Sequence, residues 1–328
     1  MLKRYPLAQS RLFGLQSKKR LAGLLGVDLQ VLRKLAARTD NYRVFPIQQN
    51  NGKTRVVEEP KPEMKQLHSR LADLLSRIEP PPYLHSGTKG RSYVTNAKAH
   101  VARGPVIKTD LSKFYPSTTH HHVFVGVLRE FKCSGDVAKL IADLCTHGGH
   151  VPTGSPVSML IAFYSHKQIL DELHRRMEAQ GIKLTVYVDD LTMSGEQLNL
   201  SHLCPIKKSF KAVGLSCHKT RVFPRHSPKL ITGAIVTEQG LLLPNRRHRS
   251  IGEGIRRLSE ASSHEELQTI SRKILGQINE AAVIEERSKQ RLPGLKGLIH
   301  RLSNRGRSTA FQMPSANRRR PGSGFEEL

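Results

Sequence analysis

Two adjacent aspartates, Asp189 and Asp190, are the first residues of this sequence whose type and position suit chemistry. They stand between two short β-prone runs, 183–186 and 191–194, so the pattern predicts a hairpin that carries both carboxylates at its tip. Adjacent acids repel one another and the surrounding sequence is strongly basic, so a divalent cation is the natural partner for oxygen ligands held in this way. The hairpin is therefore a candidate metal site.

A third acid, Asp110, ends a separate strand-like run at 106–109. Strands that are distant in sequence can pair side by side in one sheet, which would bring Asp110 to the acidic hairpin. One carboxylate from each strand tip would form a clamp for two metal ions about 3.5–4 Å apart, an arrangement that serves in-line phosphoryl transfer. The sequence thus predicts phosphoryl-transfer chemistry at a site built from two strands.

The elements around these acids follow the order of a polymerase palm. A Gly-Pro loop at 152–156 and a helix at 156–179 lie between Asp110 and the hairpin, and a basic strand that contains Lys219 follows the hairpin. Acidic strand, loop with helix, acidic hairpin and basic strand together indicate a nucleotide-polymerising site.

The charge of the chain points to nucleic acid as a partner. Its 328 residues carry a formal net charge of +26 with a pI near 10.3, which suits the neutralisation of many phosphates better than a small neutral substrate. No window approaches 18 uninterrupted apolar residues, and no signal-like apolar core follows the first residues. We therefore expect a soluble, cytoplasmic protein with no membrane partner.

The cysteines and a run of histidines indicate no further metal site. The four cysteines form no Cys-x-x-Cys pair, so buried free thiols are expected rather than a zinc ribbon or a disulfide framework. Consecutive histidines at 120–122 cannot all point at one ion from a helix or strand, so a solvated or phosphate-facing run is expected.

Apolar periodicity predicts the remaining elements. The pattern at 18–37 fits a packed helical pair or a helix-turn-helix reader, and a hairpin of 42–48 and 54–57 follows around Asn50-Asn51-Gly52. Other expected elements are helices at 64–78, 122–146 and 203–213, strands at 215–223 and 230–236, loop with short strand at 83–104, and a helical domain at 250–302. A composition shift near 244 precedes that helical domain, and a basic tail follows it.

Two further blocks narrow the family. The block at 96–100 (Asn-Ala-Lys-Ala-His) matches an Asn-Ala-x-x-His element, and the block at 231–233 (Ile-Thr-Gly) matches a Val-Thr-Gly element with Ile for Val. Together with the palm-like elements, matching blocks run from about Arg55 to Pro244, over half of the chain. The sequence therefore resembles a reverse transcriptase, and most closely the bacterial retron group.

The resemblance implies an α+β, right-hand polymerase fold. Fingers and an antiparallel palm sheet flanked by helices would precede a C-terminal helical thumb. The expected parts are an N-terminal helical extension at 1–40, fingers at 41–105 and 120–160, palm at 106–119 and 161–244, thumb at 245–304, and a basic, flexible tail at 305–328.

By the same resemblance, Asp110 and Asp189 would be catalytic and would bind two Mg²⁺ ions, with Asp190 assisting. Tyr115, five residues after the first acid, would lie under the sugar of the incoming nucleotide. Its ring would exclude a 2′-hydroxyl, so that deoxynucleoside triphosphates are favoured. Core packing is the alternative role for this tyrosine.

Three more residues would bind the nucleotide. Arg55 resembles the fingers arginine that grips the triphosphate, because a guanidinium contacts phosphate oxygens bidentately; a plain surface arginine is the alternative. Lys219 would stabilise or protonate the departing pyrophosphate, or would attract phosphate backbone only. Gly154 would permit close backbone approach by template or nucleotide. Thr153 departs from the glutamine usual in the family, which puts a side-chain contact there in doubt.

RNA would bind along a basic stretch and at the two retron blocks. From 201 to 257, twelve Lys or Arg stand against two acids. The expected RNA-binding residues are Asn96, His100, Thr232, Gly233, Arg246 and Arg247.

As a retron enzyme, the protein would copy part of its own structured noncoding RNA into branched, RNA-linked single-stranded DNA (msDNA), primed from a guanosine 2′-hydroxyl. It would serve antiphage defence together with a separate effector protein. We expect no ribonuclease H domain and no maturase or endonuclease appendage. The alternatives are a group II intron-like or free-standing reverse transcriptase that primes from a 3′-hydroxyl, and a catalytically inactive RNA-binding scaffold.

Overall fold

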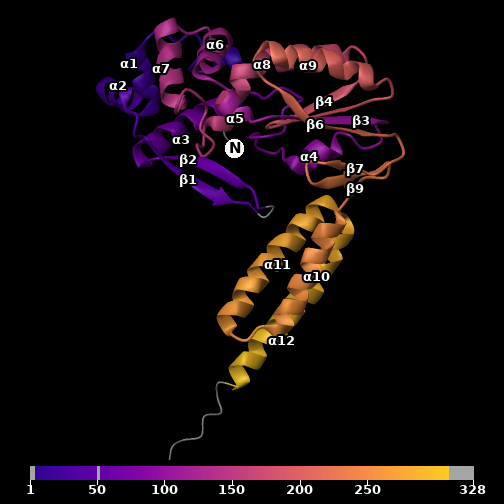
Figure 1. Ribbon diagram of the computed structural model, residues 1–328. Coiled ribbons are helices and arrows are strands. Elements are labelled where there is room, and N and C mark those ends of the chain that lie inside the picture. The colour runs from indigo at the N-terminus through magenta and orange to yellow at the C-terminus, as the bar shows by residue number, and fades with distance from the viewer. Residues whose placement is uncertain (1–3, 50–51, 310–328) are drawn as a thin grey trace, which may run out of the picture. The chain divides into compact units, whose positions relative to one another are not determined.

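The chain divides into two units, Met1–Leu242 and Leu243–Leu328, within two residues of the composition shift near 244. The computed structural model describes residues 4–49 and 52–309 (Figure 1). Helices are mixed with antiparallel sheets, as the sequence predicted. Most of the turn at 50–52 and most of the basic tail lie outside the described residues.

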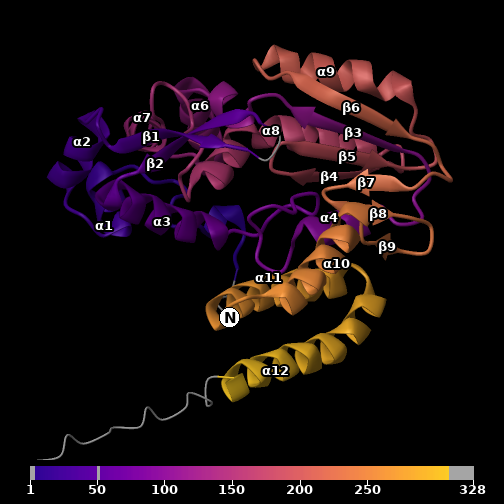
Figure 2. The same cartoon turned by 60° about the horizontal axis from the view of Figure 1, so that its bottom comes forward.

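A four-stranded antiparallel sheet carries the acidic strands in the first unit (Figure 2). Its strands, in spatial order, are β4 (Lys183–Tyr187), β5 (Asp190–Ser194), β3 (Val106–Leu111) and β6 (Cys217–Phe223). Because side chains alternate along a strand, Ile107 and Leu111 enter the hydrophobic core while Asp110 points to the opposite face.

Two longer helices cover one face of this sheet, and one short helix lies across the other face. In Figure 1, α8 (Ser158–Glu178) and α9 (Leu203–Ala212) lie over one face, and α4 (Tyr93–Lys98) lies across the other. A small sheet of β7 (Lys229–Ile231), β8 (Ala234–Val236) and β9 (Leu241–Leu242) packs against α4.

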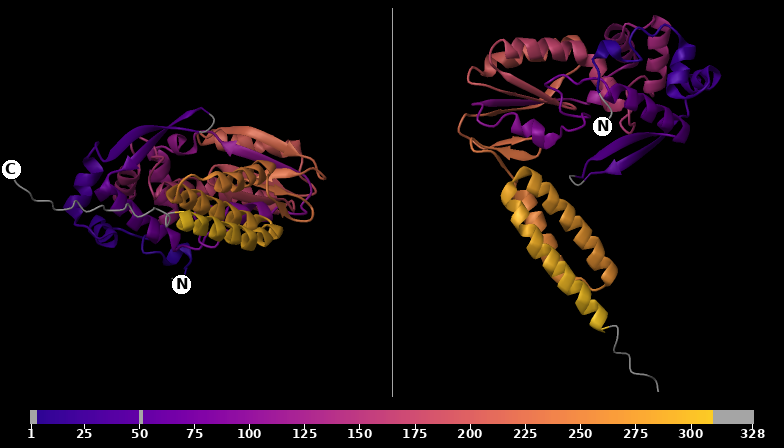
Figure 3. Two further views of the ribbon diagram at one scale, coloured as in Figure 1. Left: turned by 90° about the horizontal axis from the view of Figure 1, so that it is seen from below. Right: turned by 180° about the vertical axis from the view of Figure 1, so that it is seen from behind.

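The rest of the first unit is a helical cluster with a projecting hairpin. The cluster is built from η1 (Leu7–Gln9), α1 (Lys18–Leu25), α2 (Leu29–Ala37), α3 (Pro62–Ser76), α5 (Phe114–Ser117), α6 (His120–Phe131) and α7 (Gly135–Cys145). The short helix η2 (Leu200–His202) is not part of it and directly precedes α9. The hairpin of β1 (Tyr42–Gln48) and β2 (Thr54–Pro60) extends away from α3 (Figure 3). Buried leucines of α1 and α2, among them Leu21, Leu32 and Leu35, make these helices a packed pair.

The second unit is helical. It contains α10 (Asn245–Glu260), α11 (His264–Ile284), η3 (Glu286–Gln290) and α12 (Arg291–Thr309). Ser263 caps α11 by accepting a hydrogen bond from the Glu266 amide, as its capping-box sequence predicts. None of the described helices is both long enough and apolar enough to cross a membrane.

Three segments differ from their predicted form. The helix predicted at 122–146 is split into α6 and α7, because Lys132 adopts a left-handed conformation (φ 49°) and ends α6. The loop predicted at 83–104 contains α4, which a capping box of Ser92 and Thr95 starts. The strand predicted at 230–236 turns at Thr232 and Gly233 into two strands.

The cysteines and the histidine run are only partly as expected. All four cysteines are free, and Cys133 and Cys145 are buried, but Cys204 is exposed. His120 pairs with Asp143 at 2.8 Å, so part of the histidine run is engaged with a protein carboxylate rather than free for phosphate.

Candidate active site

Three aspartates gather at one end of the four-stranded sheet. Asp110 of β3 lies directly opposite Asp190 of β5 in the strand register. Asp189 occupies the two-residue turn between β4 and β5, and its carbonyl accepts a hydrogen bond from the Leu111 amide at 2.9 Å. The turn is thereby tied to β3, which brings together the acids that the sequence singled out.

Backbone strain is concentrated around these acids. Val188 has φ 59°, a left-handed conformation that is unfavourable for a β-branched residue and costs about 1–3 kcal/mol. Lys113, just after β3, and Lys219, at the irregular pairing of β6 with β3, also have positive φ. Strain that persists in this way is typical of turns whose geometry serves a function.

The charges at the site are incompletely balanced. Burial, followed by the nearby Asp110 carboxylate, raises the pKa of Asp189 to about 6. Lys108 Nζ lies 3.0 Å from an Asp190 carboxylate oxygen, and Lys219 Nζ lies 3.3 Å from an Asp110 oxygen. Two lysines therefore partly offset three acids, and Asp189 is the acid that lacks an ammonium partner among the described ion pairs.

The donor set has the chemistry that Mg²⁺ requires, without forming a closed cage. Carboxylate oxygens are its preferred ligands, and the mutual repulsion of Asp110 and Asp189 is what a bound cation would relieve. Within 4–49 and 52–309, however, no three His, Cys, Asp or Glu side chains are grouped closely enough to hold a metal ion. Asp110 and Asp189 thus offer carboxylate oxygens that suit a cation, and Asp110 and Asp190 each also have a lysine ammonium within 3.3 Å.

Tyr115 and Arg55 belong to the same surroundings. Tyr115 lies on α5, directly after β3, and is half-buried against the core. Burial is the largest cause that raises the pKa of Tyr115 to about 12; the Asp189 carboxylate also raises this pKa and the Arg55 guanidinium lowers it. The tyrosine is therefore within electrostatic reach of both the acidic turn and the β1–β2 hairpin, and core packing accounts for only part of its environment.

The loop with Thr153 and Gly154 holds the base of that hairpin. Thr153 Oγ1 donates to the Val56 carbonyl at 3.1 Å, and the Gly154 amide donates to the Glu58 carbonyl at 3.2 Å. A Cβ on Gly154 would lie 2.7 Å from that carbonyl oxygen. The close approach that glycine permits here is to β2 of the protein itself, and threonine in place of the usual glutamine serves to pin the hairpin.

Replacing Gly154 with alanine is expected to displace the β1–β2 hairpin. Because the contacting atom is backbone, either the loop or β2 must move by several tenths of an ångström, which shifts Arg55. With the nucleotide-binding role that the sequence resemblance implies for Arg55, the KM for deoxynucleotides should rise about 10-fold, since misplacing a binding group by a fraction of an ångström weakens positioning. Steady-state primer extension measures this, with Gly135→Ala, where a Cβ meets nothing within 4 Å, as the control; equal KM values would contradict the assigned role.

The two retron blocks are bound to each other inside the protein. Asn96 is 0% exposed and its amide donates to Thr232 Oγ1 at 3.3 Å. His100 is 1% exposed and shares hydrogen bonds of 2.7 Å with Ser194 and with Thr185 on the sheet. Neither Asn96 nor His100 is accessible to RNA in this structure, which corrects their expected direct contact: they join α4 to the central sheet and to the β7–β8 turn.

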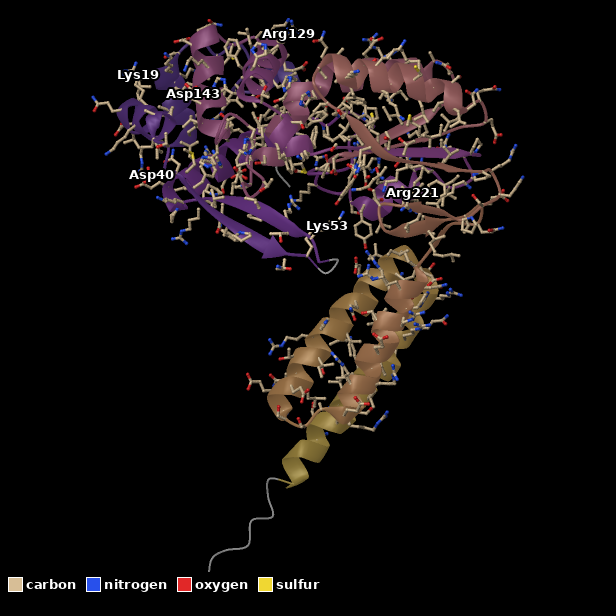
Figure 4. All side chains as sticks on the ribbon, viewed as in Figure 1. Lys19, Asp40, Lys53, Arg129, Asp143 and Arg221 are labelled. Atoms are coloured by element: carbon tan, nitrogen blue, oxygen red, sulfur yellow. The ribbon has the colours of Figure 1, made fainter. Side chains whose placement is uncertain are left out.

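The other expected RNA-binding residues remain partly accessible. Thr232 and Gly233 form the β7–β8 turn and are half-buried. On α10 of the second unit, Arg246 is exposed and Arg247 donates to Glu280 at 3.0 Å. Basic residues also line the first unit: Figure 4 shows Lys53 near the hairpin tip and Arg221 on β6.

Lys108 is a site residue that the sequence reasoning missed. It precedes Asp110 by two residues, and strand alternation places both on the same face. That alternation was available from the sequence, whereas its partner Asp190 could be named only once β3 and β5 were known to pair.

Comparison with known proteins shows which enzymes this chain resembles in sequence. Retron Se72 reverse transcriptase of Salmonella heidelberg (strain 579083-10) is 28% identical over 180 residues, covering 54% of this chain and 48% of that protein. Retron Mx65 reverse transcriptase of Myxococcus xanthus is 31% identical over 260 residues, covering 70% and 61%. The chain is a relative of the retron reverse transcriptases.

Retron Ec86 reverse transcriptase of Escherichia coli is a further relative, 22% identical over 234 residues, 69% of this chain and 72% of that protein. The chain spans about half the length of the Se72 enzyme and about three fifths of the Mx65 enzyme. No family model matches this retron relative. Among solved structures, telomerase from Candida albicans aligns at 8% identity with a TM-score of 0.46, over 84% of this chain and 62% of that chain, a likeness too low to support a functional conclusion.

Proposed function

We propose that this chain is an RNA-directed DNA polymerase of the retron type. The observation that supports it is the placement of Asp110 opposite Asp190, with Asp189 at the adjoining strained turn, in a relative of retron reverse transcriptases. Carboxylates from two neighbouring strands are the arrangement that two-metal phosphoryl transfer uses.

The parts of the fold are assigned accordingly. The β1–β2 hairpin and the helices within 41–105 and 120–160 serve as fingers, and the four-stranded sheet within 106–119 and 161–244 serves as the palm. The helices of 245–304 serve as the thumb, with 1–40 as an N-terminal extension and 305–328 as a tail, although α12 continues to Thr309 in the structure.

Residues of the site divide the work of nucleotide addition. Mg²⁺ held by Asp110 and Asp189 would supply charge neutralisation for attack on the α-phosphate and for the leaving pyrophosphate. Arg55 contacts the triphosphate bidentately from the hairpin. Tyr115 lies under the sugar and excludes a 2′-hydroxyl. Lys219, 3.3 Å from Asp110, is placed to stabilise or protonate the leaving group.

The template is the cognate noncoding RNA of the retron. Its copying gives msDNA, primed from the 2′-hydroxyl of a guanosine, within an antiphage defence system that includes an effector protein. The basic surfaces of α9, β6 and α10 bind RNA mainly through phosphates and shape.

Primer extension tests the polymerase proposal. The purified protein, given a primed RNA, Mg²⁺ and deoxynucleoside triphosphates, should extend the primer. Salt-sensitive RNA binding without extension would instead identify a catalytically inactive scaffold.

The bond that joins RNA to DNA in nucleic acid copurified from native cells tests whether the enzyme is of the retron type. Sequencing across a 2′,5′ branch point supports priming from a guanosine 2′-hydroxyl. Products that begin only at a 3′-hydroxyl would favour a group II intron-like or free-standing reverse transcriptase.

Tyr115→Ala is expected to relax the choice of sugar. Without the ring there is room for a 2′-hydroxyl, so the preference for deoxynucleotides over ribonucleotides should fall about 10- to 100-fold, as loss of a steric contact of 1–3 kcal/mol implies. The measurement is the ratio of kcat/KM for the two nucleotide types. Tyr115→Phe keeps the ring and should keep the preference; if both variants discriminate like the wild type, Tyr115 is a packing residue.

A further inference from the structure

A segment before α4 lies alongside the acidic hairpin as a partial extra strand. Leu84 forms a parallel bridge with Val186 at the end of β4. The Val186 amide donates to the Tyr83 carbonyl at 2.8 Å, and the His85 amide donates to the Val186 carbonyl at 2.9 Å. Residues 81–86, which we call the brace, therefore hold β4 at the point where it enters the turn.

The next residue of the brace reaches the turn itself. Ser86 is 4% exposed, and its Oγ accepts a hydrogen bond from the Val188 amide at 2.9 Å. Val188 is the residue in the left-handed conformation, and Asp189 follows it directly. The hydroxyl thus fixes the strained peptide that determines where the Asp189 side chain points.

The brace is anchored on its other side. The Arg91 guanidinium donates to the Pro81 carbonyl at 2.7 Å and to the Leu84 carbonyl at 2.5 Å. His85 shares a hydrogen bond of 3.0 Å with Thr95, the residue that completes the capping box of α4. Ser86 is therefore buried on a segment that is held on both sides, and such a serine can hold a turn more firmly than a serine on a mobile loop.

We propose that Ser86 is a positioning residue: through the Val188 amide it fixes Asp189 toward Asp110. This inference rests on the proposed polymerase function, and it goes beyond the roles assigned there because Ser86 touches neither nucleotide nor cation. It acts only through the backbone of the turn.

Removing the hydroxyl tests this role kinetically. Ser86→Ala should lower kcat for primer extension about 10- to 100-fold, since small displacements of a reacting group have effects of that size. RNA binding and the KM for deoxynucleotides should stay within about 2-fold. Ser86→Thr retains the hydroxyl and should restore most of kcat. Ser165→Ala removes a half-buried serine hydroxyl on α8, hydrogen-bonded to the Ile161 carbonyl at 2.7 Å, and should leave kcat unchanged.

Coupling to the strained residue gives a second test. Glycine adopts positive φ without strain. In a Val188→Gly background, Ser86→Ala should therefore have an effect of less than about 3-fold. An equal loss in both backgrounds, or wild-type kcat in Ser86→Ala, would overturn the inference.

Hydrogen exchange tests the contact independently of activity. Peptides that span 184–192 should take up deuterium faster in Ser86→Ala, whereas peptides from α7 should not. Unchanged exchange would overturn the inference even if the protein polymerises. Faster exchange together with a wild-type enzyme that fails to extend any primer would leave the contact in place and reject the proposed function instead.

Discussion

Replacing Asp189 with asparagine is expected to abolish primer extension while making the cation-free protein more stable. Asparagine is nearly isosteric but cannot supply the charge that binds a cation beside Asp110. We expect kcat to fall about 10³-fold or more, the range for groups that stabilise charge in a transition state or act in concert. Single-turnover extension of a primed RNA measures this loss.

The gain in stability follows from the pKa of Asp189. Its folded value, about 6, lies above the value near 3.8 of an ordinary aspartate. The stabilising effect of the protonated form is fully present below pH 4 and is lost as the pH rises through 6, so at pH 7 the ionised carboxylate destabilises the fold by up to about 3 kcal/mol. Asp189→Asn should therefore raise the free energy of unfolding at pH 7.5 and change it little at pH 4.

Two controls keep this prediction specific. Asp73→Asn alters an exposed aspartate on α3 and should change neither activity nor stability measurably. Adding Mg²⁺ should stabilise the wild type more than Asp189→Asn, because binding to the folded state alone raises its stability. A cation-free Asp189→Asn variant that is less stable than the wild type at pH 7.5 would contradict the assigned electrostatics.

The acidic site was predictable because its signals are local. The β-prone runs on each side of Asp189 specify the hairpin, and Asp110 closes its own strand-like run. Their pairing needed only the expectation that the two strands are neighbours, which the register of Asp110 with Asp190 confirms.

Roles that depend on distant partners could not be predicted in the same way. Asn96 and His100 were expected to contact RNA because polar residues in a recognisable block suggest a ligand. In the structure both residues are buried and hydrogen-bonded to Thr232, Ser194 and Thr185. These partners lie 85 to 136 residues away in the chain, so the sequence did not show that they would meet. Burial of a polar residue is decided by whether such partners satisfy it, which spacing alone does not reveal.

Local conformation explains the other differences. Lys132 adopts positive φ and splits the helix predicted at 122–146; lysine itself signals no break, and Ser134-Gly135, at the start of α7, is the sequence signal that the prediction passed over. The six residues of α4 are too few to show helical periodicity, so only the capping pair Ser92 and Thr95 marked its start.

Four buried histidines are expected to make the protein lose stability steeply in mild acid. Burial is the largest cause in each case, lowering the pKa of His68 and His85 to about 4 and the pKa of His100 and His166 to about 3. Each is buried and hydrogen-bonded, for example His166 to Thr118 at 3.0 Å. The folded protein therefore keeps them neutral at pH values where the unfolded chain binds protons.

The direction and size of the effect follow from this difference. The pKa of each histidine in the folded protein lies below its value of about 6.5 in the unfolded chain. The stability that the neutral histidines contribute is therefore fully present above pH 6.5 and is lost as the pH falls toward 4. Each histidine contributes a loss of about 1.4 kcal/mol per pH unit, and four together remove about 8 kcal/mol by pH 5. That loss is a large part of the stability of a typical domain, about 5–15 kcal/mol, so the free energy of unfolding should fall steeply between pH 6.5 and 5.

Urea unfolding at pH 7.5, 6.5 and 5.5 measures how the free energy of unfolding depends on pH. A single variant shows which histidine contributes to that dependence. His100→Gln removes one titrating group, so the slope of stability against pH should fall by about one proton even though the loss of the bonds to Ser194 and Thr185 lowers stability at every pH. His166→Gln provides the same test at an independent site, and His264→Gln, an exposed histidine on α11, should leave the slope unchanged. If the free energy of unfolding of the wild type does not change between pH 6.5 and 5.5, these imidazoles take up protons in the folded state. That result would contradict the burial of the four histidines, including His100 between α4 and the central sheet.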